Sequence, residues 1–313
     1  REMVEEMGRT KRIKIADAIL TADLHLTFKA PVSRTDDYGK AQENKLKFLS
    51  ELSQEHNCPI LCAGDIFDHW NAGPGLCSWA FHNLPGGMVA IPGNHDLPLH
   101  SLSQYEKSAL YLLEAVGKIT VLKGDQINIG NLKIIGIPYG VKNLHLIEGR
   151  RTNQRRRILL LHELVIQNTE SPIPGGYTAA KILEMFGKDF DLIVTGDNHQ
   201  SFTVKTKKSL LVNPGSMMRI TVDQADFRPR CYLYYAEDNT VIPVEFPIQK
   251  EVHIRDHLDQ KKERDERIAA YIERMKTDWD VGISFRANLE SFFTQNAVPK
   301  KVREIIWQHL ESI

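Results

Sequence analysis

The feature of this sequence that most constrains its fold is a repeated pairing of a short apolar run with a polar cluster. The apolar runs are rich in Leu, Ile, Val and Ala without strict alternation, which is typical of strands buried on both faces. Five of them lead into the clusters Asp23-Leu24-His25, Gly64-Asp65-Ile66-Phe67-Asp68, Gly93-Asn94-His95-Asp96, His162 and Gly196-Asp197-Asn198-His199. Because open α/β sheets place functional groups in loops at the carboxyl ends of strands, we expect these clusters to form one site.

The apolar runs and the segments between them predict a layered α/β core. Strands are expected at Ile15–Thr21, Pro59–Ala63, Met88–Ile91, Leu132–Ile137, Ile158–Leu161, Leu192–Thr195, Leu210–Val212, Tyr232–Tyr235 and Val241–Phe246. Helices are expected at Gln42–Gln54, Ser103–Val116 and Tyr177–Phe186. The second helix begins with Ser103 and Glu106 at the spacing of a capping box. Strands that alternate with helices favour the α/β class.

The sequence changes in character near Lys250. No long linker interrupts residues 11–250, so these residues are expected to form one domain. Residues 251–313 instead carry apolar side chains at helical spacing, in Gln260–Lys276 and in a helix that opens at Pro299. This helical segment holds 11 Lys and Arg against 12 Asp and Glu, so it is a poor candidate for tracking phosphates.

The residue types in the five clusters are those of a metal site. Carboxylate, amide and imidazole ligands without thiolates suit Mn²⁺, Fe or Zn²⁺ and leave positions open for water and substrate. Two metals about 3.5–4 Å apart need a shared ligand, and Asp65 is the natural bridge because Gly64 allows a tight turn. Asn94 would bind through its carbonyl oxygen and add no charge. Each cluster alone could be a turn or a cap, but five in order predict a two-metal centre.

These motifs resemble the calcineurin-like metallophosphoesterase superfamily over about residues 15–246, and Asn213-Pro214-Gly215-Ser216 fits it as well. The resemblance implies a two-sheet β-sandwich flanked by helices. It implies one metal held by Asp23, His25, Asp65 and His199, and another held by Asp65, Asn94, His162 and position 197. It also implies that His95 is the catalytic imidazole and that Asp96 orients it.

One position departs from the superfamily pattern, which usually has Gly-His-x-His where this chain has Gly196-Asp197-Asn198-His199. Asp197 can still bind a metal through oxygen, and its added negative charge would favour Mn²⁺ or Mg²⁺ over softer ions. The alternative is that Asp197 is too short to reach and the second metal binds weakly. We favour ligation, because a carboxylate beside two dications is otherwise hard to explain.

The segment Gly64–Asp68 followed by Pro74 resembles nuclease subunits of the SbcD type, in a compact version like those of phages. That resemblance implies DNA as substrate, Mn²⁺ as the favoured metal, a homodimer, and a coiled-coil ATPase of the SbcC type that docks on residues 251–313. The alternative for this segment is a small bundle packed on the core. The alternative functions are a phosphomonoesterase, a cyclic-nucleotide phosphodiesterase, or a non-catalytic scaffold with a degenerate metal site.

Charge leaves the nucleic-acid question open. The 40 Lys and Arg balance 40 Asp and Glu, although residues 142–157 hold six basic residues against one acidic residue, a local charge of 6 − 1 = +5. Lys205, Lys207 and Lys208 form a second basic patch. Each patch fits a solvated loop as well as a DNA contact. Arg34 and His69 are candidates for contacting a phosphate near the metals.

The remaining signals exclude some classes. No apolar run approaches the roughly 20 residues that span a bilayer, and Arg1–Arg12 has no apolar stretch of a signal peptide. The four cysteines show no CxxC spacing, which favours reduced core thiols. We therefore expect a protein of the cytoplasm, or of the host cytoplasm if a phage encodes it, with no membrane contact.

Overall fold

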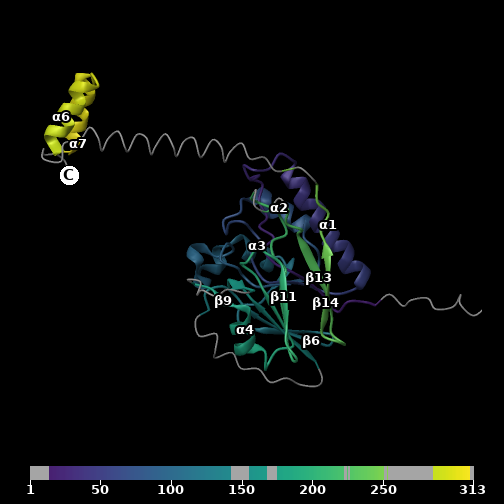
Figure 1. Ribbon diagram of the computed structural model, residues 1–313. Coiled ribbons are helices and arrows are strands. Elements are labelled where there is room, and N and C mark those ends of the chain that lie inside the picture. The colour runs from purple at the N-terminus through teal and green to yellow at the C-terminus, as the bar shows by residue number, and fades with distance from the viewer. Residues whose placement is uncertain are drawn as a thin grey trace, which may run out of the picture. The chain divides into compact units, whose positions relative to one another are not determined.

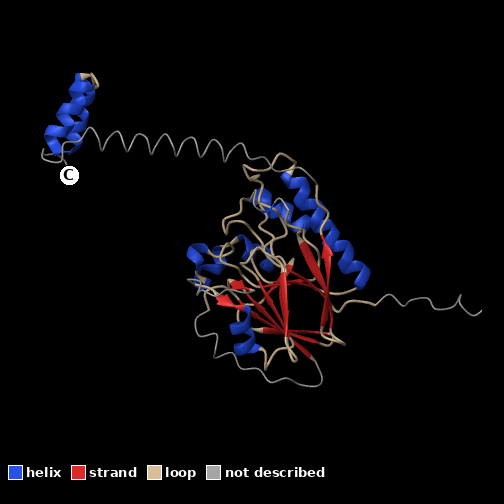
Figure 2. Ribbon diagram, in the orientation of Figure 1, coloured by secondary structure: helices blue, strands red, loops and turns tan. Residues whose placement is uncertain are grey.

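The computed structural model describes residues 14–141, 155–167, 175–221, 224, 226–249, 252 and 285–310. The chain divides into two compact units, Arg1–Ile254 and Arg255–Ile313. The described part of the first unit contains two six-stranded sheets and a two-stranded one (Figure 1). Its helices lie against the outer faces of the large sheets (Figure 2).

The first large sheet has the strand order β14-β13-β1-β2-β3-β4. In that order the strands are Thr240–Glu245, Arg230–Tyr235, Ala18–Thr21, Ile60–Cys62, Met88–Ala90 and Ile119–Val121. Strands β1 to β4 run parallel, and β13 and β14 are antiparallel additions at one side. The last residues of β1, β2 and β3 (Thr21, Cys62 and Ala90) are paired in register, so the loops that follow leave the sheet side by side.

The second large sheet has the strand order β11-β12-β10-β7-β6-β5. In that order the strands are Phe202–Lys205, Leu210–Asn213, Leu192–Thr195, Arg156–Leu161, Leu132–Ile137 and Gln126–Ile129. The four inner strands are parallel and the two edge strands are antiparallel. Leu161 pairs with both Ile137 and Thr195, so the loops after β7 and β10 also leave together.

The two large sheets pack face to face through apolar side chains such as Leu20, Leu61, Leu160 and Val194. Helices α1 (Tyr38–His56), α2 (Pro74–Asn83) and α3 (Ala109–Ala115) cover the outer face of the first sheet. Helix α4 (Ala179–Phe186) covers the second sheet, beside the small pair β8 (Val165–Ile166) and β9 (Tyr177–Thr178). The predicted α/β class, with two sheets flanked by helices, is confirmed.

The prediction of one helix over Ser103–Val116 is wrong. The chain forms the short 3-10 helices η1 (Pro98–His100) and η2 (Leu102–Lys107) before α3 begins. Ser108 caps α3, because its hydroxyl accepts a hydrogen bond from the Tyr111 N–H at 3.1 Å. The capping pattern at Ser103 therefore lies in η2, and the α-helix begins only after that element.

The second unit contains helices α6 (Phe285–Gln295) and α7 (Lys300–Leu310). They pack on each other through Phe293, which is 2% exposed and whose ring meets that of Trp307 edge-on at 6.0 Å. The Pro299 carbonyl accepts from the Val302 N–H, so α7 opens where the sequence predicts a helix. The helix expected at Gln260–Lys276 lies outside the described residues. Among the described helices, none has the length and apolarity to cross a bilayer.

Candidate metal centre

The residues predicted as metal ligands converge at the carboxyl edge of the two large sheets. Loops after β1, β2 and β3 carry Asp23, His25, Asp65 and Asn94 from the first sheet. Loops after β7 and β10 carry His162, Asp197 and His199 from the second sheet. Five of these residues form two overlapping groups of possible ligands, which are Asp23, His25 and His199 in one and Asp23, Asp65 and His162 in the other.

The backbone of these loops is unusual. Asp23, His25, Asp65 and Asp197 all have positive φ, with values of 51°, 45°, 54° and 70°. Such a conformation costs on the order of 1–3 kcal/mol for a residue other than glycine, so the surroundings must enforce it. Here the first two loops lock each other, because the Asp23 N–H donates to the Gly64 carbonyl and the His25 N–H to the Asp65 carbonyl, both at 3.0 Å.

Glycines precede the ligands because neighbouring ligands approach them closely. Gly64 has a φ of 103°, and a Cβ there would collide with the His162 ring. A Cβ at Gly93 would collide with Asp65, and one at Gly196 would collide with the Ala63 carbonyl and the His162 ring. The glycines of three motifs thus serve close packing within the site, besides the tight turn expected at Gly64.

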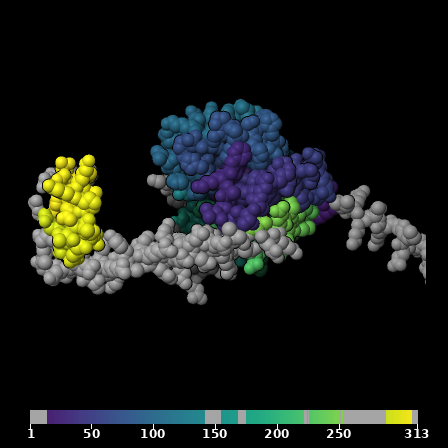
Figure 3. Space-filling view, turned by 90° about the horizontal axis from the view of Figure 1, so that it is seen from above, coloured from purple at the N-terminus to yellow at the C-terminus, as the bar shows by residue number. Residues whose placement is uncertain are grey.

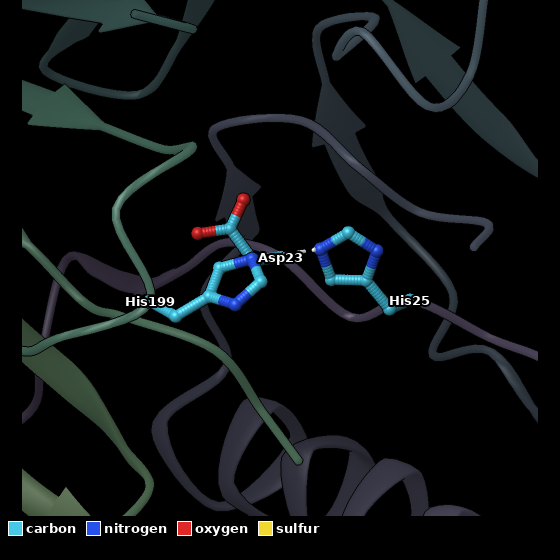
Figure 4. A group of neighbouring side chains, drawn as sticks. All are labelled: Asp23, His25 and His199. Carbon is cyan, nitrogen blue, oxygen red and sulfur yellow. Dashed lines mark hydrogen bonds between the residues drawn. The ribbon is translucent and has the colours of Figure 1, made fainter. Parts of the chain in front are cut away.

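In the first group, two imidazole nitrogens face one another beside a carboxylate. Figure 4 shows the side chains of Asp23, His25 and His199. The Nε2 atoms of the two histidines lie 3.1 Å apart. Burial lowers the pKa of His25 to about 3 and also lowers the pKa of His199, so both rings are neutral and can offer lone pairs. Asp23 is fully buried, and its Oδ1 accepts from the Asp197 N–H at 3.0 Å.

In the second group, Asp65 connects both halves of the site. Asp65 Oδ2 lies 3.5 Å from His162 Nε2 and 3.6 Å from His25 Nε2, which is the position expected of a bridging ligand. His162 Nδ1 donates to the Ala63 carbonyl at 2.6 Å, and His162 Nε2 lies 3.0 Å from Asn94 Oδ1. Burial opposes a charge on His162, but Asp65 and Asp23 outweigh it and raise its pKa to about 10, so this pocket favours positive charge.

A divalent cation fits these residues. Among the described residues, Asp23 Oδ2 and Asp65 Oδ2 are buried without a hydrogen-bond partner. An unpartnered buried carboxylate oxygen is costly, and a metal ion would supply the missing partner. The donors are carboxylate, amide and imidazole groups, as hard divalent ions prefer. Asp23, His25, Asp65, Asn94, His162 and His199 would hold such ions.

Asp197 reaches the site through its backbone. Its N–H binds Asp23 Oδ1, but its half-buried carboxylate belongs to none of the ligand groups found among the described residues. The proximity of Asp197 raises the pKa of Glu163, after the larger effect of burial, so its charge is felt inside the site. Metal ligation by Asp197 stays a prediction.

The predicted pairing of His95 with Asp96 is wrong in its geometry. The buried Asp96 carboxylate accepts from the N–H groups of Gly93, Ile66 and Phe67 at 3.0–3.2 Å. His95 is instead oriented by the Asp68 carbonyl, 2.8 Å from its Nδ1, while its N–H donates to Asp65 Oδ1 at 2.9 Å. Asp96 thus shapes the loop that carries His95, because neighbours in a loop can point in different directions.

The prediction that Arg34 contacts a phosphate is wrong for this structure. Its side chain is only 4% exposed and forms a two-point ion pair with Asp36, at 2.7 and 2.6 Å. Its third contact is to the Arg219 carbonyl at 3.0 Å. His69, by contrast, is exposed next to Asp68 and accepts from the Asn71 N–H at 3.1 Å. A phosphate contact by His69 stays a prediction.

The described residues of the two basic patches lie at the strand ends opposite the metal centre. Arg156 and Arg157 begin β7, at the strand end opposite His162, and Arg156 is bound to Asp191 and to the carbonyls of Ala236 and Glu237. Lys205, Lys207 and Lys208 lie where β11 ends and before β12 begins, again at the amino edge of the sheet. Residues 142–154 of the first basic patch lie outside the described residues.

Sequence reasoning gave no role to two residues that build the site. Asp68 binds His95 through its carbonyl, and its Oδ1 lies 3.6 Å from His25 Nδ1. Asn213 donates to the carbonyls of Asn198 and Gln200, both at 2.6 Å, and thereby holds the loop that carries His199. Asn213 could have been identified from sequence as a polar residue at the end of the buried strand β12.

Comparison with known proteins identifies the family of the chain. The family model of the calcineurin-like phosphoesterases matches residues 18–201. No curated protein matches the chain. Two similar solved structures are a novel archaeal phosphodiesterase (13% identity, 73% of this chain and 98% of that chain, TM-score 0.40) and a putative 5'-nucleotidase from Staphylococcus aureus (13%, 79% and 58%, TM-score 0.43). The chain belongs to the family of calcineurin-like phosphoesterases, which use divalent metals.

Proposed function

We propose that this protein hydrolyses phosphodiesters of DNA with two divalent metal ions, of which Mn²⁺ is the favoured one. The observation that carries the proposal is the position of Asp65 Oδ2, which faces one histidine from each ligand group at 3.5 and 3.6 Å. A carboxylate that lies close to ligands of both groups is what a pair of closely spaced ions requires. When bound, the metals would activate water as the nucleophile and neutralise charge on the phosphate.

The chain itself supplies the proton transfer. His95 Nδ1 donates to the Asp68 carbonyl, so Nε2 is the nitrogen left to exchange a proton with the substrate. A protonated His95 would give that proton to the leaving oxygen. Asn94 and His95 are half-buried at the edge of the sheets, so part of each side chain is accessible to a substrate. The segment Gly64–Asp68 and Pro74, which opens α2, resemble nuclease subunits of the SbcD type. This resemblance also supports DNA as the substrate.

The second unit offers a surface for the proposed coiled-coil ATPase. Phe292, Val302 and Ile305 are 39%, 43% and 61% exposed, although Phe293 between the same helices is buried. Apolar residues at such helical spacing are typical of a helix-in-groove contact. A homodimer would use another apolar surface, on α2 and α3, where Phe81 and Leu112 are 41% and 47% exposed.

The test of the proposed activity uses four substrates with the full chain. These are linear duplex DNA, single-stranded DNA, bis(p-nitrophenyl) phosphate and p-nitrophenyl phosphate, each with Mn²⁺, Mg²⁺ or a chelator. We expect Mn²⁺-dependent cleavage of DNA and of the diester, and loss of both in the chelator. Preference for the monoester would favour the phosphomonoesterase alternative. Bound metal without hydrolysis of any substrate would favour the non-catalytic scaffold.

A further inference from the structure

An open hollow of about 370 Å³ lies beside the metal centre. One wall is the segment that follows β1, including Leu26, Phe28 and Lys29, and the other is the segment from Asp68 to the start of α2. In Figure 3, purple residues from the early part of the chain lie against blue residues from the segments that follow. The hollow is therefore built from the two loops that also carry His25 and Asp65.

The hollow is continuous with the reacting groups. Asp68 forms part of its wall, and the carbonyl of the same residue binds His95 Nδ1 at 2.8 Å. The Asp68 carboxylate lies 3.6 Å from His25 Nδ1, and Leu26 follows His25 directly. A phosphate bound at the metals would thus place one of its organic substituents at the mouth of this hollow.

The chemistry of the walls favours a flat apolar group. Phe28 is 58% exposed, which is unusual for so large an apolar side chain, and it is held in place by an edge-on contact with Trp79 at 5.9 Å. The start of α2 adds Pro74 and Leu76 to the wall. Exposed aromatic rings bind nucleobases by stacking, and they do so for any base. Lys29 and His69 line the same hollow and can approach a neighbouring phosphate.

We propose that this hollow holds the nucleobase of the nucleotide next to the scissile phosphate, with the base against Phe28. This inference rests on the proposed function. A base can enter the hollow only when it has left the helical stack, so an unpaired or frayed end is a better substrate than the interior of a duplex. The hollow would thus favour substrates that offer an unpaired base, whichever of the four bases it is.

Gly73 gives a clean way to fill the hollow. A Cβ at Gly73 would meet nothing within 4 Å, and its φ and ψ of −64° and 160° are open to any residue. Gly73→Leu therefore puts a side chain into the hollow without backbone strain. Gly86→Leu is the matched control, since a Cβ at Gly86 also meets nothing and Gly86 does not line the hollow. Phe28→Ala is the second variant, and it removes the ring without filling space.

The readout is a ratio of two kcat/KM values in Mn²⁺. The substrates are thymidine 5'-(p-nitrophenyl phosphate) and methyl p-nitrophenyl phosphate, which share the scissile bond and the leaving group and differ in the nucleoside. We expect Gly73→Leu and Phe28→Ala to lower the nucleoside-to-methyl ratio about 5- to 150-fold, mainly through KM, and Gly86→Leu to keep it. Thymidine 5'-monophosphate should also inhibit Gly73→Leu more weakly than the unmodified protein.

An unchanged ratio in Gly73→Leu and Phe28→Ala would overturn the nucleobase site, even if both substrates reacted more slowly. Thermal unfolding of each variant separates loss of fold from loss of binding. A different result would defeat the proposed function itself, namely that the unmodified, metal-loaded protein hydrolyses neither diester. In that case the inference falls with it, so the two failures have separate signatures.

Discussion

The loops of the two large sheets contribute to the metal centre in different ways. Asp23, His25 and Asp65 from the first sheet are at most 2% exposed, and their loops are joined by hydrogen bonds to each other. The second-sheet loops are tied to the first sheet, because His162 binds the Ala63 carbonyl and the Asp197 N–H binds Asp23. The loop that carries His199 is also held from within the second sheet by Asn213. The first-sheet loops are therefore joined directly to each other, whereas the second-sheet loops depend on contacts to both sheets.

The departure from the common pattern lies in a second-sheet loop. The first-sheet motifs are complete, whereas the substituted position, Asp197, lies half-buried in the loop after β10. Its anchoring contact uses the backbone N–H, which any residue except proline can supply. The contact that anchors this loop to Asp23 therefore does not itself require an aspartate at position 197.

The largest effect is expected for Asp65→Asn, on the first sheet. The substitution removes the negative charge that faces both ligand groups, so we expect loss of bound metal and activity below detection. Elemental analysis of the purified variant measures the metal content. Asp226→Asn, an exposed carboxylate on the described chain, is the control. Two ions per chain in Asp65→Asn would contradict the bridging role.

The next largest effect is expected for His95→Ala, which tests chemistry separately from metal binding. The Asp65 Oδ1 contact comes from the His95 backbone N–H, so the variant retains it and should keep both metals. We expect kcat to fall about 10²–10⁴-fold, the usual contribution of general acid–base catalysis. Kinetics and metal content are measured on the same sample. Turnover within about threefold of the unmodified protein would remove His95 from the mechanism.

A smaller effect is expected for Asp197 on the second sheet. If its carboxylate binds metal, Asp197→Ala should weaken the second site by about tenfold or more, while the first site stays filled. Asp197→His should be tolerated and should shift preference toward softer ions such as Zn²⁺. Metal titration by calorimetry resolves the two sites. Equal second-site affinity in Asp197→Ala and the unmodified protein would show that Asp197 is no ligand.

The smallest effect is expected for Lys45, which links α1 to the segment that follows β12. This α1 residue is buried and donates to the carbonyl of Met217 at 2.6 Å, and the Met217 N–H binds the Asp23 carbonyl. Burial lowers the pKa of Lys45 from 10.5 to about 7. Between these values the unfolded chain holds a proton that the folded chain lacks, so this residue makes stability rise with pH.

Lys45→Met removes that dependence. We expect the melting temperature of Lys45→Met relative to the unmodified protein to be highest below pH 7 and to fall toward pH 9. The change corresponds to on the order of 2 kcal/mol. Lys47→Met, on the exposed side of the same helix, should show no such trend. A constant difference between Lys45→Met and the unmodified protein across this range would refute the buried-lysine explanation.

The sequence predicted the buried strands well, because their apolar runs are uninterrupted. Leu132–Ile137 and Leu192–Thr195 match β6 and β10 residue for residue. The strands β5 and β11 lie at sheet edges and consist mostly of exposed and half-buried positions, so their short patterns resemble loops. Helix α2 was missed as well, although Pro74 at its first turn was a usable start signal.

The predicted ligands came together because strand direction alone places them at one edge. The same rule, applied to the basic residues, would have placed Arg156 away from the site, since it begins β7 rather than following it. The environment of Arg34 could not be predicted from sequence, because one of its partners, the Arg219 carbonyl, is 185 residues away in the chain. The direction of side chains in loops could not be predicted from sequence either. The carboxylate of Asp96 binds backbone N–H groups rather than the neighbouring His95 ring.

The register of the first sheet has a consequence for insertions and deletions. Thr21, Cys62 and Ala90 end their strands in line, and each is followed within four residues by a ligand. Removing one residue from any of these strands would shift the following loop by about 3.3 Å and turn its side chains to the opposite face. Length changes should therefore be tolerated in the loops at the amino edge of the sheets and selected against between each strand and its ligand.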